Sequence, residues 1–534
     1  MNQSQKLQQF INNHLQQIIP LQREAALAGW QLQTEGTIEA RDRSAELRAK
    51  TAAIYANEEH YQFLASLNPK ELEDEVLKRE HSLLLRSFRT GRMTPEAIQN
   101  IAVFSADIAF TFNEHRAILQ GKEVTDNELN AVLQSSSSAE LRKEAWEAGK
   151  TIGENVVERV LQLAVLRNEE AKRLGFRDYY ALSLYNQEIE EERLFEILDH
   201  LEKSMDPLWR KYRDELDKKL AERFHTTPEQ IRPWHHDNSF FQTVSKGESE
   251  VETLLTPIDP AKTTQQYFEN IGLPVEDLMQ KADLYERPGK CQHAFCLNVD
   301  REGDIRVLCN ITPSERWCTT TMHEFGHAAY DKYIPKQVPF LLRRPAHTMT
   351  TESVALLMGR FTHNPHWLQR YTGASEESIV RLAKPARKAA LENLLVFTHW
   401  CLVMAHFERA LYANPHQDLN TLWWDLVERF QRVARPENRD KPDWASKIHV
   451  ASHPVYYHNY LLGEMMATQI LHYAENTVLA HLPESDRLLS PEFGKYLQNR
   501  LFAPGAVRPW EEWLEYAAGA KLQPDVFVQQ VERL

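Results

Sequence analysis

Residues 316–334, RWCTTTMHEFGHAAYDKYI, predict one helix with a metal-ligand pattern at its centre. His323 and His327 are four residues apart, so a helix places both imidazoles on one face, where they can share a cation. Glu324 then lies beside that cation. Neutral imidazole suits zinc, and three protein ligands leave a fourth position for water. The stretch therefore predicts a zinc site on a helix.

The HExxH pattern alone is weak evidence, because histidine is frequent in this chain. With 22 histidines in 534 residues, roughly 0.1 matches are expected by chance. The alternative is a solvated helix face that carries the two histidines and Glu324. Phe325, Ala328 and Tyr330 make the segment largely apolar, which disfavours a fully solvated face.

A second predicted helix supplies a third candidate ligand. After a proline-rich loop at residues 335–345, the sequence TMTTESVALLMGRF at 348–361 predicts a helix that begins at Thr350 or Thr351. Glu352 falls in its first turn. A carboxylate from a second helix completes a set that one helix cannot provide. Taken alone, a glutamate at this position is more often an ordinary acidic residue at a helix N-terminus than a metal ligand.

Upstream, residues 291–311, CQHAFCLNVDREGDIRVLCNI, predict a β-hairpin around the polar turn 300–304. The remaining sequence, to about Ala221 and from Arg316 almost to the end, has helical spacing of apolar residues. The fold class is therefore mainly α.

The proline-rich stretch 226–260, which includes KGESE, predicts an irregular connection and a hinge. We expect one metallopeptidase unit over residues 1–534, with an N-terminal lobe at 1–260 and a catalytic lobe at 261–534.

Composition excludes several classes of protein. The net charge of -14, from 76 acidic and 62 basic residues, disfavours binding to nucleic acid or anionic lipid. The N-terminus has no basic and apolar signal segment, and the most apolar stretch, 394–404, is too short to span a membrane. Five cysteines without a CxxC pair imply neither a disulfide framework nor a cysteine metal site. We expect a cytoplasmic location and no membrane partner.

The combined pattern resembles the angiotensin-converting-enzyme-like family of zinc peptidases, especially its bacterial peptidyl-dipeptidases, which are related to thimet-type and oligoendopeptidase-type enzymes. The family core is HExGH, an arginine in the next loop and a glutamate ligand. Here these are HEFGH, Arg343 and Glu352. His293 and Ala294, between Cys291 and Cys309, are similar to the family's substrate-binding edge strand and its adjoining cysteine pair.

Further matches lie on both sides of this core. Lys447, His449, Tyr457 and Tyr460 are similar to the family's lysine, histidine and paired tyrosines, and the Arg167-Asn168 segment resembles one shared with oligopeptidases. Asn459 stands where chloride-activated relatives have arginine, and Leu356 replaces an aspartate that supports a histidine ligand. The resemblance therefore does not extend to chloride activation or to that support.

The resemblance implies a gluzincin-type fold, a large helical ellipsoid of two lobes around a deep substrate cleft, with a small hairpin lining the site. It assigns the metal to His323, His327 and Glu352, proton transfer to Glu324, oxyanion stabilisation to His449 and Tyr460, and substrate binding to His293, Ala294, Lys447 and Tyr457.

The expected activity is zinc-dependent release of dipeptides from the C-termini of oligopeptides, a carboxypeptidase action. A thimet-type oligoendopeptidase shares the zinc motif and differs in where it cuts. A catalytically silent zinc-containing peptide-binding protein is an alternative of another class, which the intact Glu324 disfavours. The oligomeric state cannot be predicted from these residues.

Overall fold

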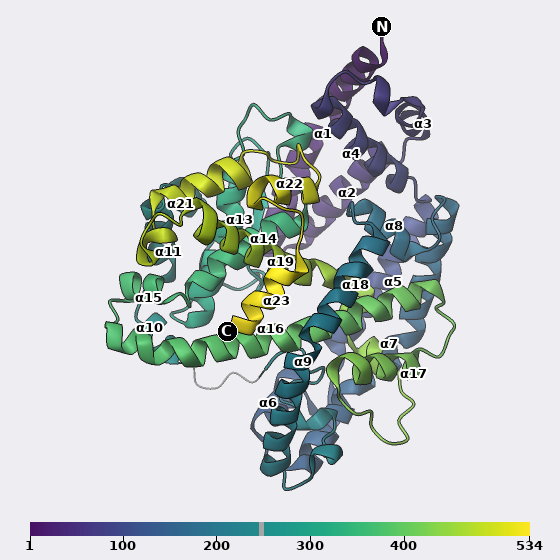
Figure 1. The fold of residues 1–534 in the computed structure, drawn as a ribbon. Coiled ribbons are helices and arrows are strands. Elements are labelled where there is room, and N and C mark those ends of the chain that lie inside the picture. Colours follow the sequence, from purple (N-terminus) through teal and green to yellow (C-terminus); the bar gives the residue numbers. More distant parts are fainter. Residues whose placement is uncertain (245–249, 534) are drawn as a thin grey trace. The chain divides into compact units, whose positions relative to one another are not determined.

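The computed structural model describes residues 1–244 and 250–533. Helices dominate it, so the predicted mainly α class is confirmed (Figure 1). The chain forms two compact units, each built from separate stretches: Met1–Arg92, Glu248–Ala386 and Leu462–Phe527 in the first, and Met93–Gly247, Arg387–Leu461 and Val528–Leu534 in the second. This interleaving differs from the single division expected near residue 260. Residues 245–249, within the expected hinge, lie outside the described residues.

The first unit is mainly helical and contains the predicted β-hairpin. The longer helices of this unit are α1 (Gln3–Glu35), α2 (Ile38–Tyr55), α3 (Glu58–Ser66), α4 (Glu75–Gly91), α11 (Pro260–Asn270), α13 (Glu315–Lys332), α14 (Thr348–Phe361), α15 (Pro365–Thr372) and α22 (Trp510–Ala518). Shorter turns are α10 (Glu250–Leu255), α12 (Glu276–Met279), η4 (Phe340–Leu342), α20 (Glu484–Arg487) and α21 (Pro491–Tyr496).

The second unit is built on helices of eight residues or more. They are α5 (Pro95–Glu114), α6 (Asp126–Ser135), α7 (Ala139–Arg173), α8 (Tyr179–Asn186), α9 (Glu191–Arg223) and α17 (Leu419–Leu426), followed by the short η6 (Asp443–Ser446) and α18 (His449–Ser452). Three helices have residues in both units: α16 (Glu376–Ala413), α19 (Tyr457–Tyr473) and α23 (Pro524–Arg533).

The predicted hairpin is confirmed. Strands β3 (Phe295–Asn298) and β4 (Ile305–Leu308) pair antiparallel, with Phe295 opposite Leu308 and Asn298 opposite Ile305. A second small hairpin, β1 (Ala117–Leu119) with β2 (Lys122–Val124), was not predicted. Its strands have only three residues each, too few for a period-2 pattern to stand out from the helical sequence around them.

The helix that carries HEFGH is confirmed, and the start predicted for the next helix is wrong. The side chain of Ser314 accepts a hydrogen bond from Trp317 N–H and caps α13. Helix α14 begins at Thr348, two or three residues early, because the His347 side chain accepts from Met349 N–H and acts as the cap. Glu352 is therefore the fifth helical residue, beyond the first turn.

The apolar stretch 394–404 belongs to a much longer helix than expected. Among the described residues, α16 is the one helix that is long and apolar enough to cross a membrane. Of its most apolar stretch of 18 residues, 61% is buried. The core helix of a soluble protein meets the same criteria, so this is weak evidence for a span.

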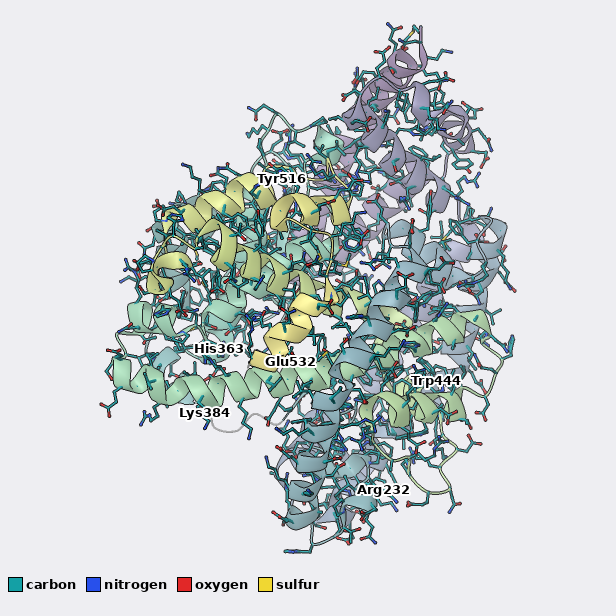
Figure 2. All side chains as sticks on the ribbon, viewed as in Figure 1. Arg232, His363, Lys384, Trp444, Tyr516 and Glu532 are labelled. Carbon is teal, nitrogen blue, oxygen red and sulfur yellow. The ribbon has the colours of Figure 1, made fainter. Side chains whose placement is uncertain are left out.

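Side chains of both units are drawn in Figure 2. Lys384, His363 and Glu532 are exposed, whereas Trp444 is buried within the second unit (Figure 2).

Candidate metal centre

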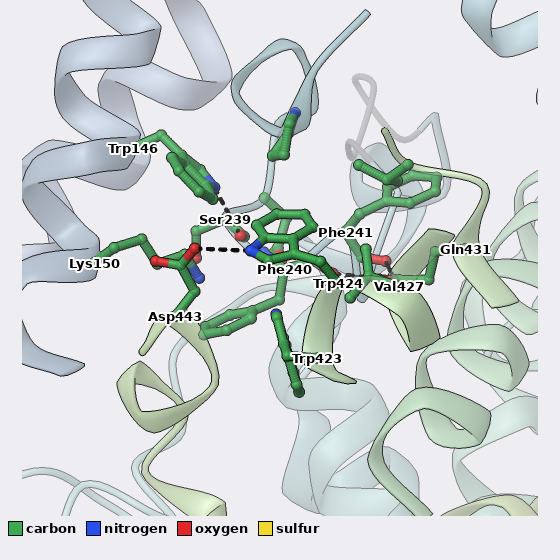
Figure 3. Close-up of a pocket in the computed structure, with 13 residues that line it drawn as sticks. Trp146, Lys150, Ser239, Phe240, Phe241, Trp423, Trp424, Val427, Gln431 and Asp443 are labelled. Atoms are coloured by element: carbon green, nitrogen blue, oxygen red, sulfur yellow. Dashed lines mark hydrogen bonds between the residues drawn. The ribbon is translucent and has the colours of Figure 1, made fainter. Parts of the chain in front are cut away.

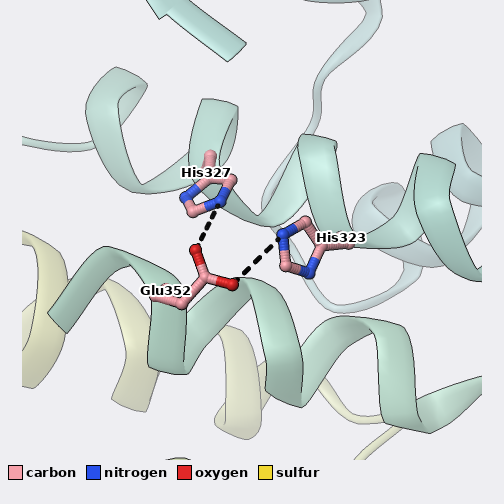
Figure 4. Close-up of side chains that lie close together, drawn as sticks. All are labelled: His323, His327 and Glu352. Atoms are coloured by element: carbon pink, nitrogen blue, oxygen red, sulfur yellow. Dashed lines mark ion pairs between the residues drawn. The ribbon is translucent and has the colours of Figure 1, made fainter. Parts of the chain in front are cut away.

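Three side chains from two helices of the first unit converge on one point. His323 Nε2 lies 3.6 Å from Glu352 Oε1, and His327 Nε2 lies 3.5 Å from Glu352 Oε2 (Figure 4). The ligand atoms of all three lie within 4.8 Å of one another. The structure therefore brings together the three residues that the sequence predicts as ligands, two from α13 and one from α14.

Gly326 explains why the two helices approach closely enough. A Cβ atom at this position would lie 3.0 Å from Ala355 Cα and 3.1 Å from Met358 Cγ, both on α14. These distances are shorter than most Cβ contacts, so a larger residue would push the helices apart. The glycine inside HEFGH thus sets the spacing between the histidines and Glu352.

The support that Leu356 cannot give comes from its neighbours in α14. Thr351 Oγ1 lies 2.7 Å from His327 Nδ1, and the backbone of Ala355 hydrogen-bonds to His323. Both imidazoles direct Nε2 toward Glu352, and Nδ1 of His327 is held by Thr351. Such contacts fix the tautomer and orientation of metal-binding histidines.

The charges around this point suit a divalent cation. Burial lowers the pKa of His323 to about 4, so its imidazole is neutral at physiological pH. Burial also acts on His327, yet its pKa is raised because Glu352, Glu324 and Asp331 all face it. The pKa of Glu352 is lowered by the two histidines, despite its burial. His323, His327 and Glu352 match the zinc donor set of two histidines and one glutamate, and Glu324 and Asp331 add negative charge nearby.

Glu324 is not part of a solvated helix face. Only 7% of the residue is exposed, and burial raises its pKa to about 7. Its position directly after His323 keeps it beside the candidate ligands without belonging to them. A buried carboxyl at this place can take up and release a proton near neutral pH.

One face of the β3–β4 hairpin lies along α13. Asn298 hydrogen-bonds to Asp331, while Cys296 and Cys309, on the same face of the sheet, lie near Glu324. His293 and Ala294 immediately precede β3 rather than lying within it. The structure thus places the expected substrate strand beside the helix that carries the histidines.

The other predicted residues gather in the second unit. Lys447 is 8% exposed, and its Nζ donates to Gln242 Oε1 at 2.7 Å. The ring centroids of His449 and Tyr457 are 5.2 Å apart, and those of Tyr457 and Tyr460 are 5.6 Å apart. Gln242 was missed, since a single glutamine in an irregular segment gives no sequence signal.

The protonation states of this group suit hydrogen bonding to a peptide. Burial, with Lys447 and His453, lowers the pKa of His449 to about 4, so its ring is neutral. His449 Nδ1 is buried without a hydrogen-bond partner. Burial lowers the pKa of Lys447 to about 8, which leaves the ammonium mostly charged at pH 7.

The segment that carries His449 is braced from its own unit. Arg167 Nη2 donates to the carbonyl of Ala451 at 2.8 Å, which gives a structural role to the Arg167-Asn168 motif. Val455 has φ of +56°, an unusual conformation for a β-branched residue. Its N–H donates at 2.7 Å to the buried Glu408. These contacts hold the turn between His449 and Tyr457.

A small pocket in the second unit contains none of the predicted residues (Figure 3). Lys150 lies in its wall with Nζ 3.2 Å from the centroid of the Phe240 ring. Asp443, which pairs with Arg439 at 2.7 Å, is the carboxylate that offsets this buried cation. Lys447 lies over the same Phe240 ring at 5.3 Å. The sequence reasoning missed this cluster, because its members lie far apart along the chain.

A helix with HExxH, a glutamate on the following helix and a buried carboxyl beside them define the class of HExxH metallopeptidases. The profile of peptidase family M3 matches residues 132–533, and that of angiotensin-converting enzyme matches residues 1–233. The chain therefore belongs to peptidase family M3, and the predicted resemblance to angiotensin-converting-enzyme-like and thimet-type metallopeptidases is confirmed.

One curated relative is the inactive angiotensin-converting enzyme-related protein of Caenorhabditis elegans. It is 22% identical over 197 residues. The match covers 35% of this chain and 22% of that relative, so the chain spans less than a quarter of its length.

Proposed function

We propose that this protein hydrolyses peptide bonds in oligopeptides with one zinc ion held by His323, His327 and Glu352. The observation that carries the proposal is the convergence of these ligand atoms within 4.8 Å, beside the buried Glu324. Membership of a metallopeptidase family supports it. When bound, zinc supplies Lewis acidity toward the peptide carbonyl and lowers the pKa of water.

The chain's own residues handle the proton and the developing charge. Glu324 accepts a proton from the attacking water and returns it to the leaving amine, so one carboxyl acts as base and then as acid. The resemblance assigns to His449 and Tyr460 the hydrogen bonds to the carbonyl oxygen as it becomes negative. A neutral His449 ring, which keeps one N–H to donate, supports this assignment.

The substrate contacts favour release of C-terminal dipeptides. Lys447, held by Gln242 and close to Tyr457, offers a charged donor to a terminal carboxylate. The backbone at His293 and Ala294 leads into β3, the edge of a two-stranded sheet that can pair with an extended peptide. Lys447 would thus select a free C-terminus, and β3 would pair with peptide backbone rather than with side chains.

A thimet-type oligoendopeptidase is the second candidate, because the longer profile match is to family M3. Two peptides that differ only in a free or amidated C-terminus separate the activities by mass spectrometry of the products. Carboxydipeptidase action predicts loss of a dipeptide from the free peptide and little turnover of the amide. Equal internal cleavage of both peptides would assign endopeptidase action.

A silent peptide-binding protein is the remaining alternative. The curated relative is itself described as inactive. Here the ligand atoms of His323, His327 and Glu352 converge within 4.8 Å and the buried Glu324 is retained beside them, which supports an active enzyme. The same peptide assay, with and without chelator, tests this alternative, since a binding protein would leave both peptides intact.

A further inference from the structure

The tip of the β3–β4 hairpin and the loop between the two ligand helices hold each other through two arginines. Arg301, in the hairpin turn, donates from Nη1 to the carbonyl of Phe340 at 3.0 Å. Arg343, in the loop, donates from Nη1 to the carbonyl of Arg301 at 3.3 Å. Each guanidinium thus bonds to the backbone of the segment that carries the other.

Further contacts make this connection rigid. Arg343 also donates to the carbonyl of Val338 at 3.0 Å and of Lys336 at 2.5 Å, and it pairs with Glu302. Only 13% of its side chain is exposed. The Arg301 guanidinium lies 4.9 Å from the centroid of the Phe340 ring. We call these contacts, centred on Arg301 and Arg343, the arginine clamp.

The clamp also reaches the histidine helix. Arg301 faces Asp331, which hydrogen-bonds to Asn298 of β3 and faces His327. Arg301 has φ of +55°, and its N–H donates to Asn298 Oδ1 at 2.8 Å, so its conformation is fixed locally. The hairpin tip is therefore joined to α13 through Asp331 and to the loop before α14 through Arg343.

An isolated two-stranded hairpin is only marginally stable in water. A strand that pairs with an extended peptide needs a fixed position relative to the metal, because small displacements of a bound substrate cost much of the rate. Contacts between the hairpin and the rest of its unit must therefore hold the strands in place. The arginine clamp provides these contacts at the hairpin turn.

We propose that Arg301 and Arg343 are positioning residues that fix the substrate-pairing strand β3 relative to the two metal-ligand helices. The expected change in peptide kinetics rests on the proposed function, whereas the expected change in hairpin mobility does not. Loss of the clamp leaves the metal ligands intact and lets the strand move, so it weakens peptide binding more than the chemical step.

The test compares Arg343→Gln with Lys336→Ala, a control that removes another cation paired with Glu302 and keeps every backbone contact of the clamp. Hydrogen–deuterium exchange is measured for the amides of residues 295–308 and of α13, with zinc content and steady-state kinetics on an extended peptide. For Arg343→Gln we expect roughly tenfold faster exchange in the hairpin, unchanged exchange in α13 and one zinc per chain. KM should rise roughly tenfold with kcat within about threefold of the wild-type value.

Unchanged hairpin exchange in Arg343→Gln, or a fall in kcat and zinc content at constant KM, would overturn the proposal. If Arg343→Gln does not fold, Arg301→Gln and Glu302→Gln replace it. Unchanged hydrogen exchange in the hairpin of both variants would also overturn the proposal. Should the wild-type protein lack peptidase activity, the proposed function fails, while the exchange experiment still decides whether the clamp holds the strand.

Discussion

Thr351 Oγ1 lies 2.7 Å from Nδ1 of His327, so the residue directly before the glutamate ligand holds one of the histidine ligands. Thr351 and Glu352 are neighbours in the same turn of α14, which couples the orientation of His327 on α13 to the placement of Glu352. Removing such a support typically weakens metal binding about 10- to 100-fold.

Thr351→Val should therefore lower zinc affinity by about 10- to 100-fold with the fold intact. Competition with a fluorescent chelator measures the affinity, and Thr351→Ser, which keeps the hydroxyl, is the matched control. Equal affinities for the valine and serine variants would show that the hydroxyl does not orient His327.

Glu324→Gln should keep one zinc per chain and lose about 10²- to 10⁴-fold in kcat, because the amide cannot accept the proton of water. Zinc analysis and peptide turnover on the same sample separate the two effects. Glu315→Gln, on the same helix and paired with His363, should retain turnover. A Glu324→Gln enzyme with wild-type kcat would remove Glu324 from the mechanism.

Tyr460→Phe and His449→Gln should each lower kcat by about 10²- to 10³-fold with smaller changes in KM, because a donor to an oxyanion acts mainly in the transition state. Tyr456→Phe, one turn before Tyr460, is a control for the loss of a neighbouring hydroxyl. A rise in KM alone would assign these residues to ground-state binding.

Glu408 makes the stability of the protein depend on pH. Burial raises its pKa to about 8 from an ordinary value of 4.5. The folded state therefore retains the proton that the unfolded chain loses, and this contribution to stability is full below pH 4.5 and is lost as the pH rises to about 8. The free energy of unfolding should fall by up to about 1.4 kcal/mol per pH unit in this window from this group.

Glu408→Gln keeps an acceptor for Val455 N–H and should remove that slope, which denaturant unfolding at several pH values measures. Glu428→Gln is the contrasting control, since hydrogen bonds from Arg435 outweigh burial and lower the pKa of Glu428. Glu428→Gln should change the pH dependence of the free energy of unfolding only at acidic pH. An unchanged slope in Glu408→Gln would show that this carboxyl is ionised in the folded protein.

The features that depend on local patterns could be predicted from the sequence. The α13 helix, the β3–β4 hairpin and the pairing of His323 with His327 follow from spacing and turn residues. The start of α14 could not, because a histidine acts as its cap. Gln242, Lys150 with Asp443, and the contact of Arg343 with Arg301 join residues far apart in the chain, and no local pattern encodes such contacts.

The metal content of the purified chain of 534 residues tests the central claim most directly. We predict about one zinc per chain by elemental mass spectrometry, as expected for a single three-ligand site. His323→Ala and Glu352→Ala should each lose this zinc, and chelation should abolish peptide hydrolysis until zinc is restored. A wild-type chain that binds no divalent ion, or that hydrolyses peptides equally well after complete chelation, would contradict the account.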